Sequence, residues 1–392
     1  MNRISRLWLF VRQCFSIEGY GRGVVQLQCN TVNYRILPSG FKIESEEYGF
    51  SARFNGDGAW CTARLDGDFY RRCVDGRVLR NSELSSDIAA QSVQDRLSEV
   101  ILRLSCDRED AVLQGALNSI VSSSRKDFSR LRGLYDVVYP EGVPVLPPDR
   151  YRDYVVPLTL GCPNGRCSFC AFYRDRPFRV FSQGLESPQN LNSHLERVKV
   201  LVGESRDGVF LGSANALAAP EHYIRAMLLA VPHHFGDLPR GVACFADADH
   251  ISRRNREALP LFAGLGVQLV VLGLETGSSL LRGKLNKKAD TRATCQLVKA
   301  LQTAGISVGL TVLTGFLASD DFDEHLAGTL SLIEGLALQT NDKVYVSPWF
   351  GDGADHPGLR AITEMEAMKS ALRRVTCARV TGYSSNNFYY FS

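Results

Sequence analysis

The sequence predicts an α/β protein: a partial (β/α)6 barrel of the TIM type, preceded by a small α+β domain. Beyond about residue 150, apolar runs of strand length alternate with amphipathic helical segments, a pattern typical of a parallel sheet. Before residue 140, short strand-like segments come first and a helical period follows. We therefore expect an N-terminal domain over 1–140, a core over 150–350, and a C-terminal extension over 351–392 whose structure the pattern does not define.

In the N-terminal domain, strand-like segments between about residues 22 and 80 alternate with turns. The segments include VVQLQC, VNYRIL and FSARF, and the turns LPSG, NGDG and VDGR supply Gly, Asn and Asp. From Ser82 to about Leu134 the apolar period is helical. One predicted face of these helices consists of Leu97, Val100, Ile101 and Leu104. The proline-rich YPEGVPVLPPDRY then indicates a linker, with a domain boundary between Pro140 and Asp149.

Six apolar runs predict the strands of the core. They are VVPLTL (155–160), GVFLGS (208–213), GVACFA (241–246), VQLVVLGLE (267–275), SVGLTVLTG (307–315) and KVYVSPW (343–349). Segments between them, such as EHYIRAMLLAV and TRATCQLVKALQTAG, are amphipathic. Because a barrel of this kind has its functional groups on the loops after the strands, we expect the site at the carboxyl ends of these runs.

Charge and hydropathy exclude several classes of protein. The net charge of +3 and pI of about 8.3 are too mild to predict a nucleic acid as partner. The densest basic patch, Arg174, Arg176 and Arg179, could bind a small anion or could be three solvated arginines. The N-terminal apolar run between Arg6 and Arg12 has only five residues, too few for a signal peptide. No run reaches the roughly 18 apolar residues of a membrane helix, so we expect a cytoplasmic protein.

The cysteines carry the most specific signal. The chain has 11, of which eight are scattered and are expected to be buried small hydrophobes in a reducing compartment. Cys162, Cys167 and Cys170 form a C-x4-C-x2-C loop after the first core run, which we expect to bring three thiolates to one point. A structural zinc site normally has four protein ligands, and the nearest downstream histidine, His194, is expected on a helix surface. A [4Fe–4S] cluster held by three cysteines leaves one iron open for a non-protein ligand.

With this loop the chain resembles the radical S-adenosylmethionine (radical SAM) superfamily over roughly residues 150–350. The resemblance rests on the cysteine loop, on Phe169 just before Cys170, and on the strand ends FLGSAN (210–215), GLETGS (273–278) and GLTVLTG (309–315). The common family spacing is C-x3-C-x2-C. The longer first spacing here is similar to that of the radical SAM part of Elongator and of the methylthiotransferases.

The resemblance implies a [4Fe–4S] cluster on Cys162, Cys167 and Cys170, with S-adenosylmethionine (SAM) bound at the open iron. It implies reductive cleavage of SAM to a 5′-deoxyadenosyl radical that abstracts hydrogen from an unknown substrate, with a flavodoxin or ferredoxin as reductant. The SAM contacts it implies are Phe169, Gly212, Ser213, Asn215, Glu275, Thr276, Ser278, Gly309, Thr311 and Leu313. Two departures remain open: the 212–215 segment has one glycine and no glutamate, and Glu275 could instead cap the next helix.

The groups that act on the substrate are less well defined. Cys244 could return a hydrogen atom or be a buried thiol facing a helix, and Asp247, with Asp249 and His250, follows the same run. The lysines of LRGKLNKK lie near the expected SAM side, although such a loop is usually solvated. A zinc-stabilised binding module without catalysis is the alternative function, and it requires a fourth protein ligand. We expect residues 1–140 to recognise the substrate.

Overall fold

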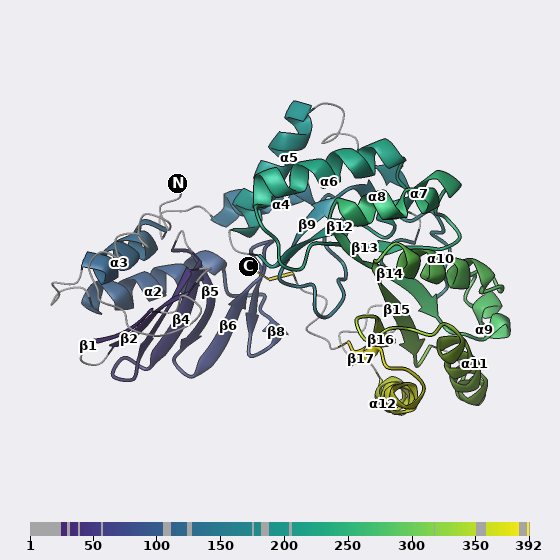
Figure 1. Ribbon diagram of the computed structural model, residues 1–392. Helices are drawn as coiled ribbons and strands as arrows, with labels where there is room; N and C mark the ends of the chain where they lie inside the picture. The colour runs from purple at the N-terminus through teal and green to yellow at the C-terminus, as the bar shows by residue number, and fades with distance from the viewer. Residues whose placement is uncertain are drawn as a thin grey trace. The chain divides into compact units, whose positions relative to one another are not determined.

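The computed structural model divides the chain into two compact units (Figure 1). One consists of Met1–Pro140, Lys199–Ser205 and Tyr390–Ser392, and the other of Glu141–Val198 and Arg206–Tyr389. The structure describes residues 25–29, 32–37, 40–55, 58–104, 111–123, 128–174, 176–181, 188–203, 206–316, 318–349, 358–383 and 390–391. The apolar run near the N-terminus, considered above as a signal peptide, lies outside these residues.

The first unit contains an eight-stranded antiparallel sheet in which every strand pairs with its neighbours in sequence. Its strands are β1 (Val25–Cys29), β2 (Val32–Leu37), β3 (Gly40–Ser45), β4 (Phe50–Asn55), β5 (Trp60–Leu65), β6 (Asp68–Arg72), β7 (Val78–Arg80) and β8 (Glu83–Leu84). Buried and partly exposed residues alternate along β3 and β4, as expected of strands with one covered face. Three of the strands are those predicted from VVQLQC, VNYRIL and FSARF.

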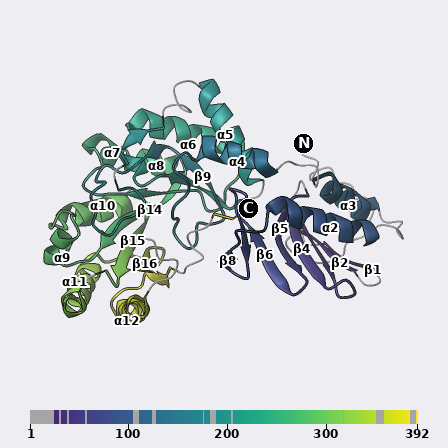
Figure 2. The same ribbon diagram turned by 180° about the vertical axis from the view of Figure 1, so that it is seen from behind.

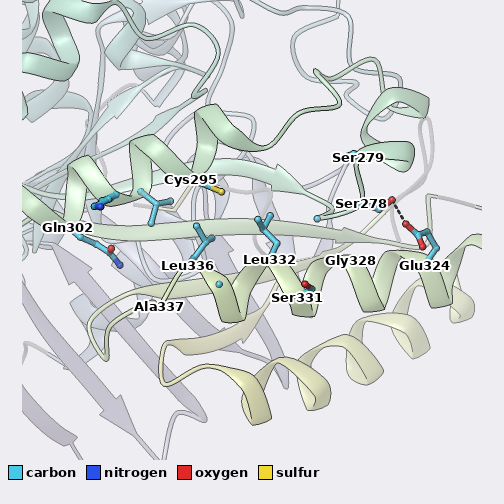
Figure 3. A pocket seen from close by; sticks show the side chains of 14 residues that line it. Ser278, Ser279, Cys295, Gln302, Glu324, Gly328, Ser331, Leu332, Leu336 and Ala337 are labelled. Atoms are coloured by element: carbon cyan, nitrogen blue, oxygen red, sulfur yellow. Dashed lines mark hydrogen bonds between the residues drawn. The ribbon is translucent and has the colours of Figure 1, made fainter.

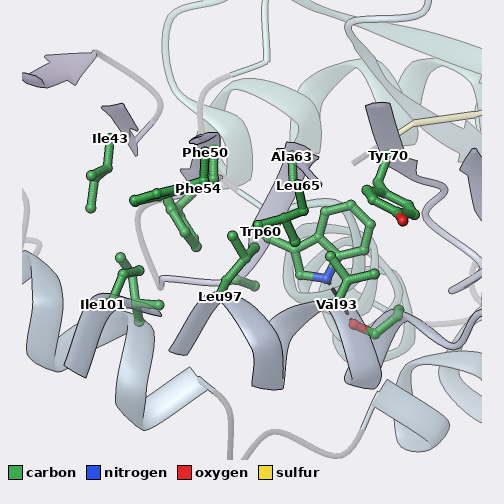
Figure 4. Packing of buried hydrophobic residues seen from close by; sticks show 14 of the residues in the cluster. Ile43, Phe50, Phe54, Trp60, Ala63, Leu65, Tyr70, Val93, Leu97 and Ile101 are labelled. Carbon is green, nitrogen blue, oxygen red and sulfur yellow. Dashed lines mark hydrogen bonds between the residues drawn. The ribbon is translucent and has the colours of Figure 1, made fainter. Parts of the chain in front are cut away.

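The helices of this unit are α2 (Ala90–Leu104), α3 (Ala111–Ser123) and α4 (Phe128–Val138). Figure 4 shows α2 packing its apolar side chains against Ile43, Phe54 and Trp60 of the sheet. Leu97 and Ile101 are fully buried, which confirms the face predicted for them. Val100 packs partly buried against the same core, and the side chain of Leu104 lies outside the described part.

The second unit is built on a seven-stranded parallel sheet, which confirms the predicted α/β class. In spatial order its strands are β9 (Asp153–Pro157), β12 (Gly208–Gly212), β13 (Val242–Ala246), β14 (Val267–Glu275), β15 (Ser307–Thr314), β16 (Lys343–Pro348) and β17 (Arg379–Gly382). The first six coincide with the six predicted runs. The seventh lies in the region 351–392, where the sequence pattern predicts no element, and pairs with β16.

Helices follow the strands and lie along one face of this sheet (Figures 1 and 2). They are α5 (Pro188–Val202), α6 (Glu221–Phe235), α7 (Arg253–Glu257), α8 (Leu259–Gly264), α9 (Ser279–Lys284), α10 (Arg292–Thr303), α11 (Phe322–Gly335) and α12 (Leu359–Val375). None of the helices in the described ranges is long and apolar enough to cross a membrane. Because all seven strands run in the same direction, their carboxyl ends, and the loops after them, share one edge of the sheet.

Two expectations about single residues are wrong. His194 of α5 is buried beside Phe181 rather than exposed, and burial lowers its pKa to about 4. Among the scattered cysteines, Cys61, Cys73 and Cys244 are buried as expected, but Cys377 is exposed and Cys295 is half-buried.

Candidate active site

The cysteine loop begins where β9 ends. Two short strands, β10 (Thr159–Leu160) and β11 (Arg179–Val180), pair antiparallel and close the loop at its base. Gly161 has a φ of +65°, and a Cβ there would lie 2.4 Å from the Pro177 carbonyl oxygen, so only glycine fits. Its N–H donates to the Glu141 carboxylate over 2.7 Å. The backbone therefore fixes the position at which the cysteine segment leaves the sheet.

The three thiols of the loop are free and half-buried. The Cys170 N–H donates to the Cys167 carbonyl oxygen over 3.2 Å, and the Asn164 amide donates to the Cys167 sulfur over 3.0 Å. Burial raises the pKa of Cys167 to about 11, although the positive charge of Lys287 lowers it. Burial also raises the pKa of Cys170, against the effect of hydrogen bonds from the Tyr173 and Phe172 N–H groups.

The three thiols lie near one another, since the charges of Cys170 and Cys162 both raise the pKa of Cys167. No three Cys, His, Asp or Glu side chains within the described ranges are grouped to hold a metal ion. A single tetrahedral zinc ion would require such a grouping, with bonds of about 2.3 Å. A four-iron cluster bonds each thiolate to a different iron and so spreads the sulfurs over a larger volume. Three free thiols on one loop are a donor set that fits a cluster of this kind.

Contacts from three separate loops hold the cysteine segment over the carboxyl ends of the strands. After α9, the Leu285 carbonyl accepts from the Ser168 N–H over 3.2 Å. At the end of β12, the Ser213 hydroxyl donates to the buried Tyr173 hydroxyl over 2.8 Å. After β16, the Trp349 indole donates to the Phe169 carbonyl over 3.3 Å. The fold thus brings the predicted Phe169 and Ser213 to the same edge of the sheet.

Glu275 ends β14 in an unusual backbone conformation. Its φ is +65°, and the strand register shifts between Gly273 and Glu275. Such conformations are uncommon for a residue with a side chain and concentrate at functional sites. The Thr311 hydroxyl donates to Glu275 Oε1 over 3.1 Å. Burial raises the pKa of Glu275, while the charge of Lys287 and this hydrogen bond lower it.

Lys287 is a candidate functional residue that the sequence pattern does not single out. The lysine-rich loop predicts solvated side chains, yet the Lys287 side chain is only 7 % exposed. Its ammonium donates to the Gly273 carbonyl oxygen over 2.5 Å and lies 3.7 Å from Glu275 Oε1. A Cβ at Gly273 would lie 2.8 Å from that Oε1 and 3.0 Å from Lys287 Nζ, so glycine leaves room for both groups. Lys284 and Lys288 are exposed and pair with Asp321 and Asp249.

Helix α11 supports the turn after β14, where Thr276 and Ser278 lie. His325 Nδ1 lies 2.9 Å from the Thr276 hydroxyl, and the Ser278 hydroxyl donates to Glu324 over 2.7 Å. The Gly277 N–H donates to the Thr329 hydroxyl over 3.0 Å. His325 is buried, and this burial lowers its pKa to about 4, so the ring is neutral near pH 7. No motif in the sequence points to these α11 side chains, because each acts only through a contact about 50 residues away.

Asp247 and His250 lie together on the loop after β13. Their nearest atoms, Asp247 Oδ1 and His250 Nδ1, are 3.6 Å apart, and the Asp249 N–H donates to Asp247 over 2.9 Å. Burial raises the pKa of Asp247, but the nearby His250 imidazole and the Lys287 charge outweigh it and hold this pKa well below its usual range. The neighbouring Asp247 carboxylate raises the pKa of His250.

Cys244 does not share this site. In the strand register, Cys244 of β13 lies opposite Val270 of β14. Gly273, three residues further along β14, lies opposite Thr311 of β15. Because side chains alternate between the faces of a strand, Cys244 and Thr311 lie on opposite faces. The thiol is buried, and this raises its pKa to about 12. Of the two interpretations of Cys244, the structure fits the buried thiol.

The remaining predicted SAM contacts lie at different positions along their strands. Asn215, after β12, is fully buried, and neither of its amide atoms has a hydrogen-bond partner in the described part of the chain. Leu313 is near the carboxyl end of β15, whereas Gly309 is near its amino end, between Val271 and Tyr345. Gly212 is the last residue of β12.

Two arginines of the basic patch, Arg174 and Arg176, bind backbone carbonyl groups. Arg174 donates to the Ser168 carbonyl over 3.0 Å, and Arg176 donates to the Glu141 carbonyl over 3.1 Å. Both contacts tie the exposed side of the cysteine segment to backbone oxygens, which neither of the two interpretations from sequence had included.

A separate pocket of about 770 Å³ lies between α10 and α11 (Figure 3). Cys295 and Gln302 of α10 and Leu332 and Leu336 of α11 line it, and the Ser278–Glu324 hydrogen bond lies at one end. The three clustered cysteines are not among its lining residues. Of the predicted SAM contacts, it shares only Ser278.

The fold and the site define an α/β enzyme domain with a cysteine-rich loop at the carboxyl edge of its sheet. Residues 156–333 match the family model described as the Radical SAM superfamily. These residues therefore form a radical SAM domain, and the substrate of the chain is not identified.

Solved structures similar to the chain include several radical SAM enzymes. SuiB from Streptococcus suis, bound to S-adenosylmethionine, is 12% identical, with 81% of this chain and 71% of that one covered and a TM-score of 0.42. Methylornithine synthase (PylB) is 15% identical, with 74% and 81% covered and a TM-score of 0.40. The cobalamin-dependent enzyme OxsB is 14% identical, with 62% and 31% covered and a TM-score of 0.37. The chain spans about a third of the OxsB and Kitasatospora setae TsrM structures. No curated protein matches it.

Proposed function

We propose that Cys162, Cys167 and Cys170 hold a [4Fe–4S] cluster and that SAM binds beside it at the carboxyl edge of the sheet. When bound, these groups supply the reductive cleavage of SAM to a 5′-deoxyadenosyl radical, which abstracts hydrogen from a substrate. The observation that carries the proposal is the placement of the cysteine loop, tied by Tyr173 to Ser213 at the end of β12. A flavodoxin or ferredoxin is the expected reductant.

Residues of the chain would orient SAM and exclude water. Asn215 is a buried amide without a partner among the described side chains, so it can hydrogen-bond a ligand that lies against the end of β12. Glu275, held by Thr311 and Lys287, offers a carboxylate to hydroxyl or ammonium groups. Phe169 presents an aromatic ring next to Phe316, 6.3 Å between centroids. We assign Asp247, close to Lys287, to the substrate side of this site.

The seven-stranded sheet is proposed to curl into a partial (β/α)6 barrel. Asp149 accepts from the Tyr345 hydroxyl over 2.9 Å and also pairs with Lys343, both on β16. The Asp153 N–H donates to the Arg150 carbonyl, so a tight turn keeps Asp149 near the start of β9. In a flat sheet, β9 and β16 would be five strand spacings apart, or about 24 Å. These contacts therefore support a curved sheet.

The test is anaerobic reconstitution of the full chain with iron and sulfide. We expect an electron paramagnetic resonance signal after dithionite reduction that changes when SAM is added, together with release of 5′-deoxyadenosine. Cys162→Ala, Cys167→Ala and Cys170→Ala should each lose cluster iron, whereas Cys377→Ala, an exposed thiol elsewhere, should keep it. A colourless protein that retains one zinc ion and is silent towards SAM would support the zinc-binding module instead.

A further inference from the structure

The sheet of the first unit has two chemically different faces. One face packs against α2 and consists of residues such as Ile43 and Phe54, which are fully buried (Figure 4). Side chains on a strand alternate between faces, so the intervening residues point the other way. Those of β3 and β4 are half-buried. We call this second surface the open face.

The strand register places basic side chains of the open face in a row across the strands. The row consists of Arg35 (β2), Lys42 (β3), Arg53 (β4), Thr62 (β5) and Arg71 (β6), each paired with the next. The adjacent row consists of Asn33, Glu44, Ser51, Arg64 and Phe69. The two rows together have five basic side chains and one acidic side chain.

This arrangement is unfavourable for the sheet itself. Neighbouring strands are about 4.8 Å apart, and like charges directly opposite each other destabilise a sheet. Arg35 lies opposite Lys42, and Lys42 lies opposite Arg53. Burial and the charge of Arg35 both lower the pKa of Lys42. Glu44 pairs with Lys42 and offsets one charge, while the Arg71 guanidinium lies over the Phe391 ring, 3.3 Å from its centroid. Because the two rows together have five basic side chains and one acidic side chain, this face favours an anionic partner.

We propose that the open face binds a single-stranded nucleic acid. From Arg35 to Arg71 the row crosses four strand spacings, about 19 Å, which matches an extended chain of phosphates better than one small anion. Four of the five basic side chains are arginines, whose planar guanidinium suits phosphate. Phe69, 38 % exposed and paired directly with Arg64, offers a ring on which a base can stack. An acidic peptide would have no use for this ring. The mild net charge of the whole chain conceals this local concentration of charge.

The binding proposal rests on the sheet of the first unit and not on the proposed radical chemistry. It is therefore tested on the full chain without iron, where failure of one proposal says nothing about the other. The probe is a fluorescein-labelled oligouridylate of about twelve nucleotides, and fluorescence anisotropy is measured from 0.05 to 0.5 M salt as design values.

The test variant is Arg35→Gln/Arg64→Gln, since both side chains are exposed. For a single strand, each phosphate contact contributes about 0.7 to the slope of log K against log salt. Removing two contacts should lower the slope by about 1.4 and weaken binding at 0.1 M salt by roughly 25-fold. The control is Arg253→Gln/Arg292→Gln, two exposed arginines of the second unit, which should bind as wild type.

A second readout separates binding from a structural role. Because Arg35→Gln relieves repulsion with Lys42, its melting temperature should equal or exceed that of wild type. The proposal is overturned if the oligouridylate does not bind at 0.05 M salt, or if the control pair weakens binding as much as the test pair. Tighter binding of polyglutamate than of the oligonucleotide would likewise overturn it in favour of an acidic peptide.

Discussion

Replacing Lys287 by methionine tests whether the site depends on one buried cation. The Lys287 ammonium donates to the Gly273 carbonyl and lies 3.7 Å from Glu275 Oε1. The side chains of Lys287 and Glu275 are only 7 % and 12 % exposed. Methionine keeps most of the aliphatic stem and removes the charge, so the substitution changes electrostatics more than packing.

The expected loss of stability follows from the buried pair. Removing one partner of a buried ion pair costs about 3–5 kcal/mol, because the other charge stays buried without compensation. The long 3.7 Å separation puts this pair at the lower end, about 3 kcal/mol. For a unit of this size, 1 kcal/mol shifts the melting temperature by roughly 2–4 °C, so the second unit should melt about 6–12 °C lower. The neighbouring Lys288→Met is the matched control: its side chain is 68 % exposed, so it should cost less than about 1 kcal/mol.

The loss should also depend on pH. Burial raises the pKa of Glu275 and Lys287 lowers it, so Lys287→Met raises it further. A carboxyl group whose pKa is raised in the folded state destabilises that state above its unfolded pKa. The deficit should therefore be largest near pH 7–8 and shrink as pH falls towards about 5. Calorimetry of the iron-free chain at several pH values measures it, and Glu275→Gln/Lys287→Met should recover part of the loss. A variant melting within about 2 °C of wild type at pH 7.5 would refute the role of Lys287.

Other substitutions test neighbouring features. His325→Ala should destabilise the second unit by about 2–3 kcal/mol and weaken SAM binding, because Thr276 loses its buried partner. His325→Gln should recover part of the stability and part of the SAM affinity. Isothermal calorimetry with SAM would show no recovery of affinity if His325 only fills space. Gly273→Ala should displace Glu275 and Lys287 and abolish SAM binding, whereas Gly283→Ala, which meets no neighbour, should not. Burial lowers the pKa of His194 and of His325 to about 4. The free energy of unfolding should therefore fall as pH drops from about 6.5 to 4. A denaturation midpoint that does not change with pH in this range would contradict the burial of the two rings.

Local pattern was sufficient for the fold of the second unit. Each of the six predicted strands is a continuous apolar run, as expected where helices cover a parallel sheet, and the cysteine loop directly follows the first of them. The strand β17 was missed because RVTG is short and largely polar. It is a strand only because β16 supplies a pairing edge, and that is a tertiary effect.

The site was less predictable, because burial decides its chemistry. In LNKK, the pattern alone predicts that Asn286, Lys287 and Lys288 are equally solvated. Of these three, only Lys287 points inward, to the space that Gly273 leaves because it has no side chain. His194 was placed on a helix surface because polar residues usually lie there, whereas its ring packs against Phe181. In both cases the deciding partner is distant or unremarkable in sequence, so no motif reveals it.

Polar groups at the carboxyl edge are more costly than the rest of the fold requires. Glu275 is buried beside Lys287 with a positive φ, and the buried Asn215 amide lacks a partner within the described ranges. An unpaired buried amide costs about 1–3 kcal/mol, and replacing it with an apolar residue would be nearly neutral. Stability alone does not account for such groups at the edge of the sheet that carries the cysteine loop. A ligand with both polar and charged groups would explain why they lie at one edge. The Asn215→Leu variant separates a role in ligand binding from a role in stability. It should melt no lower than wild type while binding SAM more weakly.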